Sequence, residues 1–328
     1  MNLLFSLLLT ASSTINPEVL QNLSELEKTS PNKALIEYNK QKHNYKYIFS
    51  ENALQFHRIA LKAAIDLYDW ETFLGILSTL KNKEFELITK KKAHHIINDI
   101  GVAYRQNYQN KDAIEHFTCA LNKTSNGNYI AALKANIATA YRVQGQPSVG
   151  FQLLNSIEHK VLDKNISAGI YNLRGNLALY LGEIDQAINY IEKARTLFIS
   201  QNKVRFASRL KFSLMTVALI KRDLSLYQVY RKNIEDDLMK LAIDNHDFLR
   251  FLDEVNHAIL IEDIPSLMSQ HITDLIKLLE RNDDANRNVR LLLKSLKLET
   301  LISHEQEPQP REPLLPSNLA SNWCDGMK

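Results

Sequence analysis

Proline spacing is the feature that most constrains this chain. After Pro31 no proline occurs until Pro147, and after Pro147 none occurs until Pro265. Because a proline inside a helix costs about 3 kcal/mol, long runs without one can be dense helix. With 9 glycines and 8 prolines in 328 residues, the two types make up about 5% of the chain, against about 12% in ordinary proteins. The sequence therefore predicts an all-α fold and argues against turn-rich β folds.

Apolar residues recur every three or four positions in two adjacent segments. These positions are Ile96, Ile97, Ile100 and Tyr104 in the first segment, and Ile114, Phe117 and Leu121 in the second. Such spacing is typical of amphipathic helices that bury one face. Because the polar stretch 106–112 separates the two segments, we predict a helical hairpin.

The hairpin recurs at steps of 37 residues. Gly101, Ala138 and Gly175 take the same place in successive units, which span 94–127, 131–164 and 168–201. Two helices approach to about 8 Å only where their facing side chains are small. We therefore expect each of these small residues to mark the crossing point of a hairpin.

At these residues the chain resembles the tetratricopeptide repeat family. The segment GVAYRQNYQNKDAIEHFTCAL places small and aromatic residues at the signature positions, namely Gly101, Tyr104, Ala113, Phe117 and Ala120. A later segment does the same with Gly175, Gly182, Ala187 and Ala194. The third unit departs from the pattern at Arg174 and Ala178, the second at Gly150 and Ile157. The resemblance implies a right-handed superhelix of stacked helical hairpins, closed by C-terminal capping helices.

The organisation expected from this resemblance has five parts. They are a secretory signal at 1–14, N-terminal helices at 15–50, repeats at 51–240, C-terminal helices at 241–302 and an extended Pro-rich tail at 303–328. The signal is predicted because LLFSLLL at 3–9 is followed by small and hydroxylic residues. A buried first helix of the array is the alternative. The two alternatives correspond to a periplasmic or secreted protein and to a cytoplasmic one.

Side chains that could carry chemistry are scattered. The sequence holds no nucleotide-binding, zinc-protease or hydrolase motif, so we expect no enzyme, no metal and no cofactor. The adjacent His94 and His95 lack the three- or four-residue spacing that helical metal ligands need. Cys119 is expected to be an inert thiol in the helix packing, and a long-range bridge to Cys324 stays open. A net charge of +3 argues against nucleic acid as the main partner.

The resemblance also implies a binding groove, because the first helix of each tetratricopeptide hairpin lines the inner wall. The positions that carry over most usefully are Asn98, Arg105, Thr139, Arg142, Asn172, Asn176 and Tyr180. Arg105 and Arg142 occupy equivalent positions, so we expect two stacked guanidinium groups that could hold a carboxylate-bearing peptide. The asparagine amides could bond a peptide backbone. The alternative is that these side chains only face solvent and the partner binds elsewhere.

The function implied is that of a non-enzymatic scaffold or sensor subunit that binds a protein or peptide and is exported. The alternative is a cytoplasmic, peptide-responsive regulator whose superhelix tightens on its ligand and so switches an effector. No window outside the N-terminal segment is long and apolar enough to predict a membrane span.

Overall fold

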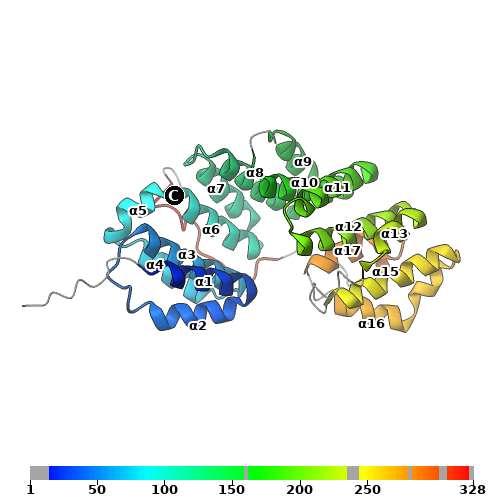
Figure 1. The fold of residues 1–328 in the computed structure, drawn as a ribbon, viewed down its shortest axis with the longest axis horizontal. Helices are drawn as coiled ribbons and strands as arrows, with labels where there is room; N and C mark the ends of the chain where they lie inside the picture. The colour runs from blue at the N-terminus through cyan, green and yellow to red at the C-terminus, as the bar shows by residue number, and fades with distance from the viewer. Residues whose placement is uncertain (1–14, 159–161, 235–243, 280–282, 303–308, 325–328) are drawn as a thin grey trace, which may run out of the picture. The chain divides into compact units, whose positions relative to one another are not determined.

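The computed structural model describes residues 15–158, 162–234, 244–279, 283–302 and 309–324. This part of the chain is helical and contains no strand. It divides into two compact units (Figure 1): unit 1 comprises Met1–Ser125 with Gln309–Lys328, and unit 2 comprises Asn126–Pro308. The predicted signal at 1–14 lies outside the described residues. The predicted all-α class is confirmed.

Unit 1 is a series of antiparallel helices. Its elements are α1 (Pro17–Thr29), α2 (Pro31–Gln41), α3 (Glu51–Asp66), α4 (Trp70–Leu80), η1 (Lys83–Phe85), α5 (Glu86–Lys91), α6 (Ala93–Gln106) and α7 (Asn110–Leu121). Polar side chains cap several starts: Asn16 accepts from the Glu18 amide and Asp69 accepts from the Thr72 amide. Pro17 and Pro31 occupy first-turn positions, where a missing N–H costs nothing. The short helix α5 was not predicted.

Unit 2 continues the pattern of paired helices. Its elements are α8 (Gly127–Val143), α9 (Pro147–Asn155), α10 (Lys164–Tyr180), α11 (Ile184–Ile199), α12 (Val204–Lys221), α13 (Leu224–Arg231), α15 (Asp244–Leu260), η2 (Ile264–Met268), α16 (Gln270–Leu279), α17 (Asp283–Ser295) and η3 (Glu299–Leu301). A continuous apolar core runs from α10 to α17, with Leu214, Phe251 and Leu292 fully buried. Burial of this apolar surface is the main stabilising contribution in unit 2.

Five hairpins share one turn geometry. In α3–α4, α6–α7, α8–α9, α10–α11 and α12–α13 a residue just beyond the first helix has a positive φ, the first residue after α12 and the second after each of the others. These residues are Tyr68, Tyr108, Gly145, Gly182 and Arg222. In each turn the next amide donates to the carbonyl five residues earlier at 2.8–2.9 Å, as from Asp69 to Ala64 and from Gln146 to Tyr141. This is the Schellman closure of a helix end. The same closure also ends α11 at Asn202 and α15 at Glu262, so it is not confined to the turns inside the hairpins.

The predicted crossing points are confirmed by close contacts of the glycines. A Cβ at Gly101 would lie 2.6 Å from the Phe117 ring, and one at Gly175 would lie 2.5 Å from Ile191 Cγ1. In the second unit the small residue lies on α9, where a Cβ at Gly150 would be 2.7 Å from the carbonyl oxygen of Ala138. The small residues therefore set how closely the helices of each pair approach.

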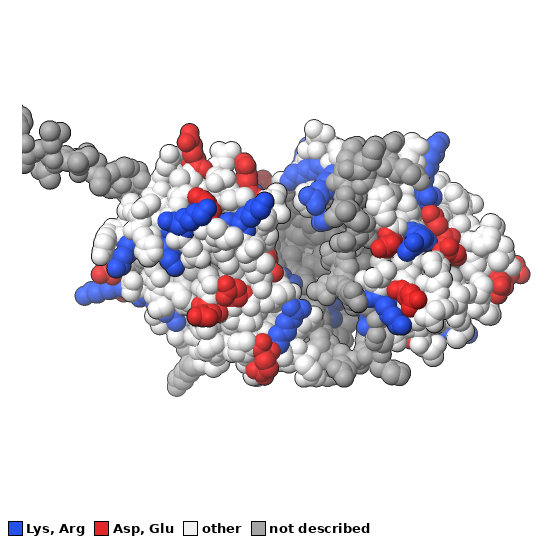
Figure 2. All heavy atoms as spheres, turned by 90° about the horizontal axis from the view of Figure 1, so that it is seen from below, with Lys and Arg blue, Asp and Glu red and all other residues white. Residues whose placement is uncertain are grey.

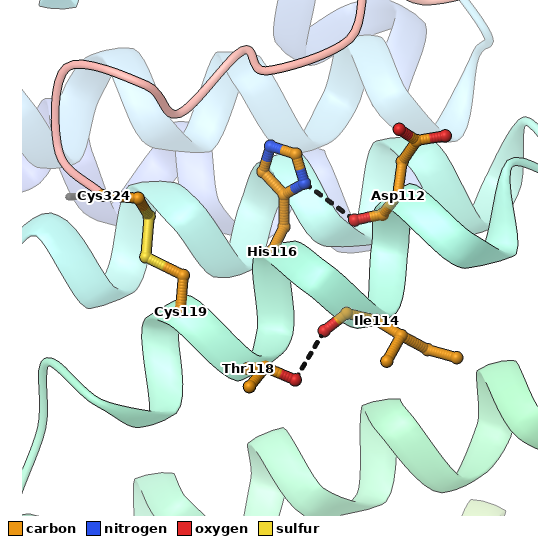
Figure 3. Close-up of a disulfide and its surroundings, with 6 residues drawn as sticks. All are labelled: Asp112, Ile114, His116, Thr118, Cys119 and Cys324. Atoms are coloured by element: carbon orange, nitrogen blue, oxygen red, sulfur yellow. Dashed lines mark hydrogen bonds between the residues drawn. A yellow bond between two sulfur atoms is a disulfide. The ribbon is translucent and has the colours of Figure 1, made fainter. Parts of the chain in front are cut away.

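The C-terminal segment corrects two expectations. We call residues 309–324 the tail segment. Its residues 317–323 form turns instead of an extended chain, and Leu315, Ala320 and Trp323 are buried. Cys324 forms a disulfide with Cys119, with the two Cα atoms 6.1 Å apart (Figure 3), so the expectation of an inert thiol is wrong. The local sequence could not show this pairing, because the partner lies 205 residues away.

Candidate functional site

The seven predicted groove residues lie on the first helices of three hairpins. Asn98 and Arg105 lie on α6 of unit 1, and the other five lie on α8 and α10 of unit 2. These five are Thr139, Arg142, Asn172, Asn176 and Tyr180. Because Arg105 and Arg142 belong to different units, their stacking stays a prediction.

In unit 2 the ends of α8 and α10 bring together two of the predicted groove residues, although the sequence did not predict them as a pair. The guanidinium carbon of Arg142 lies 5.7 Å from the centroid of the Tyr180 ring, within the range of a cation–π contact. Arg142 is 8% exposed and Tyr180 is 38% exposed. The pair thus joins two neighbouring first helices and keeps an aromatic surface accessible at its rim.

One turn of α10 places two amides on the same face. Asn172 and Asn176 are four residues apart and half-buried, so their side chains are neighbours along the helix. Asn172 Oδ1 is buried and accepts no hydrogen bond. A buried acceptor without a donor costs about 1–3 kcal/mol. Because the oxygen is buried, an incoming N–H could bond to it only after the side chain rotates towards the surface, and that bond would then be stabilising.

Thr139 contributes less than its position suggested. Its hydroxyl donates to the carbonyl of Ala135 within α8 at 2.9 Å. Because the single hydroxyl proton is used inside the helix, Thr139 can offer a ligand only an acceptor. The α8–α10 face, defined by Thr139, Arg142, Asn172, Asn176 and Tyr180, therefore presents amides, an arginine and an aromatic ring.

Arg174 is a residue whose role sequence reasoning missed. Its Nη2 donates to the carbonyl of Leu154 at 2.5 Å and to that of Ile157 at 3.5 Å, at the end of α9. Its guanidinium also lies 5.7 Å from the Tyr171 ring and 5.8 Å from the Tyr190 ring. Burial lowers the pKa of this guanidinium. The departure of Arg174 from the repeat pattern was the available signal, and it marks a side chain that completes the short helix α9.

The α6 residues of unit 1 have a different setting. Asn98 and Arg105 are half-buried, and between them Asp99 forms a buried ion pair with Arg58 of α3. The rings of His94 and His95 lie 4.2 Å apart, and burial, reinforced by the charge of Arg58, lowers the pKa of His95 to about 4. Among the described residues no group of three or more His, Cys, Asp or Glu side chains could hold a metal ion.

Surface charge is mixed on the face shown in Figure 2, where basic and acidic side chains alternate over the described atoms. The lysine run follows this pattern, because Lys90 pairs with Glu86 while Lys91 and Lys92 pair with Glu51. These are exposed contacts with small energies. No described helix has the length and apolar character that crossing a bilayer requires.

Comparisons with known proteins give a fold likeness. No protein-family model matches the chain, and no curated protein matches it. Among solved structures, the apo form of the quorum sensor NprR from B. thuringiensis is similar with a TM-score of 0.54 and 17% sequence identity, over 85% of this chain and 86% of that one. This likeness supports a tetratricopeptide-like fold of stacked helical hairpins.

Proposed function

We propose that this chain is a non-enzymatic helical-repeat sensor that binds an extended peptide along the α8–α10 face. The observation that carries the proposal is the buried Asn172 Oδ1 without a donor, on the same helix as the Tyr180 ring that Arg142 contacts. The likeness to a quorum sensor supports a sensing role. The absence of a recognised catalytic motif in the sequence favours binding over catalysis.

The chemistry of the face indicates how a peptide would be held. Asn172 would accept a backbone N–H, and Asn176, one turn further along, would offer a second amide with both donor and acceptor. Arg142 would bind a carboxylate with the planar donor edge of its guanidinium while its face stays against Tyr180. Asn98 and Arg105, on α6 of unit 1, stay predicted peptide contacts of that unit alone.

Binding would act on the protein by biasing the packing of neighbouring hairpins. A peptide that contacts both α8 and α10 binds best at one separation of the two helices, and it therefore shifts the population towards that arrangement. This mechanism corresponds to the peptide-responsive regulator. We take it as the leading function because the structural likeness is to a sensor.

An exported sensor subunit is the second candidate, and one observation favours it. Disulfides such as Cys119–Cys324 persist mainly in oxidising compartments. The intact mass of the native protein separates the two candidates. Loss of about 11–14 N-terminal residues would support export, and retention of Met1 would support the cytoplasm.

Peptide selection tests the proposed site directly. The full chain is incubated with a pool of random heptapeptides with free carboxyl termini, and retained peptides are identified by mass spectrometry. We expect a defined set to be retained, Arg142→Ala and Asn172→Leu to lower retention at least tenfold, and Arg205→Ala to leave it unchanged, because Arg205 is an exposed arginine of α12 in the same unit. No retained set, or an Arg142→Ala variant that retains the same set, would overturn the proposal.

A further inference from the structure

The tail segment is held by hydrogen bonds to its backbone, as a bound peptide would be. Gln109 uses both ends of its amide on one residue: Nε2 donates to the Leu315 carbonyl at 3.1 Å and Oε1 accepts from the Leu315 amide at 3.0 Å. Tyr104 donates its hydroxyl to the carbonyl of Pro316. The Arg311 amide donates to the carbonyl of Asn107 at 3.3 Å. Contacts of this kind satisfy any peptide backbone that follows the same path.

Side chains at every fourth position anchor the same segment. Leu315, Leu319 and Trp323 are 3%, 8% and 7% exposed, and Arg311 begins the series. Near its end, the Trp323 ring lies 5.9 Å from the ammonium of Lys81. Backbone contacts give affinity and such buried anchors give specificity. The anchors define the chemistry of a ligand: an arginine followed by two aliphatic residues and an aromatic one at intervals of four.

The arginine anchor lies between two residues with strained backbone. Tyr68 and Tyr108 have φ of 56° and 60°, a region that costs a non-glycine residue about 1–3 kcal/mol. The equivalent turns of α8–α9 and α10–α11 carry Gly145 and Gly182, and that of α12–α13 carries Arg222. The guanidinium of Arg311 lies 3.8 Å from the Tyr68 ring and 5.3 Å from the Tyr108 ring. In unit 1, tyrosines therefore occupy strained turn positions where their rings hold an arginine.

Polar groups beneath the tail lack partners of their own. His116 is 1% exposed, and its Nε2 has no hydrogen-bond partner, although Nδ1 contacts the carbonyl of Asp112 at 2.7 Å. Asn107 is fully buried, and its Oδ1 accepts no hydrogen bond. Figure 3 shows His116 on the face of α7 over which the tail runs to Cys324. Both atoms stay without a partner although the tail covers this surface, so the tail does not satisfy every polar group that it buries.

We infer that the tail segment is an intramolecular peptide ligand of the helices of unit 1, and that the Cys119–Cys324 disulfide determines whether this surface is closed by it or open to a peptide of the same chemistry. We call the surface that Tyr68, Tyr104, Tyr108, Gln109 and Cys119 outline the tail-binding surface. It belongs to unit 1 and is distinct from the α8–α10 face. The inference does not depend on the proposed function.

Opening requires a dithiol reductant. Cys119 is half-buried and Cys324 is 3% exposed, so a reductant thiolate attacks the Cys119 sulfur. A mixed disulfide forms there, and the Cys324 sulfur leaves as a thiolate that takes up a proton. The second thiol of the reductant, as its thiolate, then attacks the reductant sulfur that is bonded to Cys119. The Cys119 sulfur leaves as a thiolate and takes up a proton. Two electrons pass to the protein, and the reductant leaves as its disulfide. The tail is then held by non-covalent contacts alone.

Hydrogen exchange in the unmodified full chain tests whether the Cys119–Cys324 disulfide holds the tail segment on the tail-binding surface. The amides of Arg311 and Leu315 report on the tail, because both donate to groups of unit 1. After dithiothreitol treatment, with both cysteines shown to react with iodoacetamide, we expect these amides to exchange at least tenfold faster while amides within α6 are unchanged. Unchanged exchange at Arg311 and Leu315 would overturn the inference that reduction of the disulfide opens the tail-binding surface. Equal acceleration in α6 would show that the disulfide only stabilises unit 1, and would overturn it as well.

A peptide supplied in trans tests the tail-binding surface. The probe is a labelled synthetic peptide of residues 309–324 with Cys324→Ser, and the receptors are full chains. Cys324→Ser/Leu315→Asp displaces the chain's own tail, and the matched control is Cys324→Ser/Leu314→Asp, because Leu314 is 53% exposed. We expect the Leu315→Asp chain to bind the probe at least tenfold more tightly than the oxidised wild type, and the Leu314→Asp chain to bind no more tightly than Cys324→Ser alone.

Two further outcomes complete this test. A probe with Arg311→Ala should bind about tenfold more weakly, because it loses the contact with two aromatic rings. Equal binding of the probe to the oxidised wild type and to the Leu315→Asp chain would overturn the inference. A reduced wild-type chain that becomes a dimer in analytical ultracentrifugation would show exchange of tails between copies, and would overturn the assignment of the ligand to the same chain.

Discussion

Each unit joins two neighbouring first helices through an arginine, but the two bridges differ in burial. In unit 1 the Nε of Arg58 lies 2.7 Å from Oδ2 of Asp99, and Asp99 is 2% exposed. In unit 2 Arg142 lies over Tyr180, which is 38% exposed. The Arg58–Asp99 pair, with side chains 10% and 2% exposed, holds α3 and α6 together almost out of reach of solvent. The Tyr180 ring over which Arg142 lies stays partly open to solvent.

The largest expected effect comes from breaking the buried bridge. Asp99→Ala leaves the Arg58 guanidinium buried without its carboxylate, and we expect a loss of about 3–5 kcal/mol in the free energy of unfolding. Urea denaturation followed by circular dichroism measures it. The double variant Arg58→Met/Asp99→Leu removes both charges and should recover most of the loss. A change below about 1 kcal/mol for Asp99→Ala would mean that solvent reaches this pair and that the two bridges do not differ in kind.

The second-largest expected effect is a loss of stability at low pH that is greater in unit 1 than in unit 2. His57 lies beside Arg58 on α3, is 6% exposed and contacts the Tyr38 hydroxyl through Nδ1 at 2.9 Å. Burial lowers the pKa of His57 from 6.5 to about 4, so the folded state favours the neutral ring. Its contribution to stability is complete above about pH 6.5 and is lost as the pH falls towards 4. The difference between the pKa values of His57 in the unfolded and folded states corresponds to about 3 kcal/mol in the free energy of unfolding.

Hydrogen exchange between pH 7 and pH 4.5 measures this effect unit by unit. After correction for the intrinsic rates, unit 1 should lose protection before unit 2, because the buried histidines among the described residues, His57 and His116, both belong to unit 1. His57→Gln keeps a hydrogen-bonding group and removes one titration, so it should weaken the pH dependence of unit 1, and the remainder comes from His95 and His116, whose pKa values burial also lowers. Equal loss of protection in both units of the wild type would contradict the assignment.

Much of the hairpin pattern could be predicted because it depends on contacts close in sequence. The three-and-four spacing of Ile96, Ile100 and Tyr104 follows from the helical period, and the crossing glycines follow from the volume that a closely packed pair allows. Gly101 against Phe117 and Gly175 against Ile191 are such contacts. The structure places them as the sequence predicts, and the likeness to a solved helical-repeat protein has the same basis.

The remaining features depend on contacts between distant parts of the chain. Nothing near Cys119 indicates that Cys324 returns to it, and the prolines of the tail indicated an extended chain although Leu315, Leu319 and Trp323 are buried. The spacing of these anchors was the available signal. Of the predicted groove, the approach of Arg142 to Tyr180 depends on how two helix ends are placed, which a repeat position alone does not determine.

Two glycine-to-alanine substitutions separate the effect of close helix packing on stability from that of helix propensity. Gly150→Ala on α9 places a Cβ 2.7 Å from the backbone oxygen of Ala138, and because a backbone atom cannot move aside cheaply, we expect a loss of about 1–3 kcal/mol. Gly75→Ala on α4 is the matched control, since no atom lies within 4 Å of its added Cβ. It should gain up to about 1 kcal/mol from helix propensity. Thermal unfolding measures both, and a stabilising Gly150→Ala would show that α8 and α9 are not held at a backbone contact.

The smallest expected effect concerns the exposed bridge. Tyr180→Leu keeps an apolar side chain but removes the ring over which Arg142 lies, and a cation–π contact at a partly exposed site contributes about 0.5–1 kcal/mol. Tyr180→Phe keeps the ring and should change the free energy of unfolding by less. If the α8–α10 face binds peptide, Tyr180→Leu should lower peptide retention although it hardly changes the urea midpoint. A stability loss as large as that of Asp99→Ala would make both bridges structural, and the distinction between a closed and an accessible pair of first helices would be wrong.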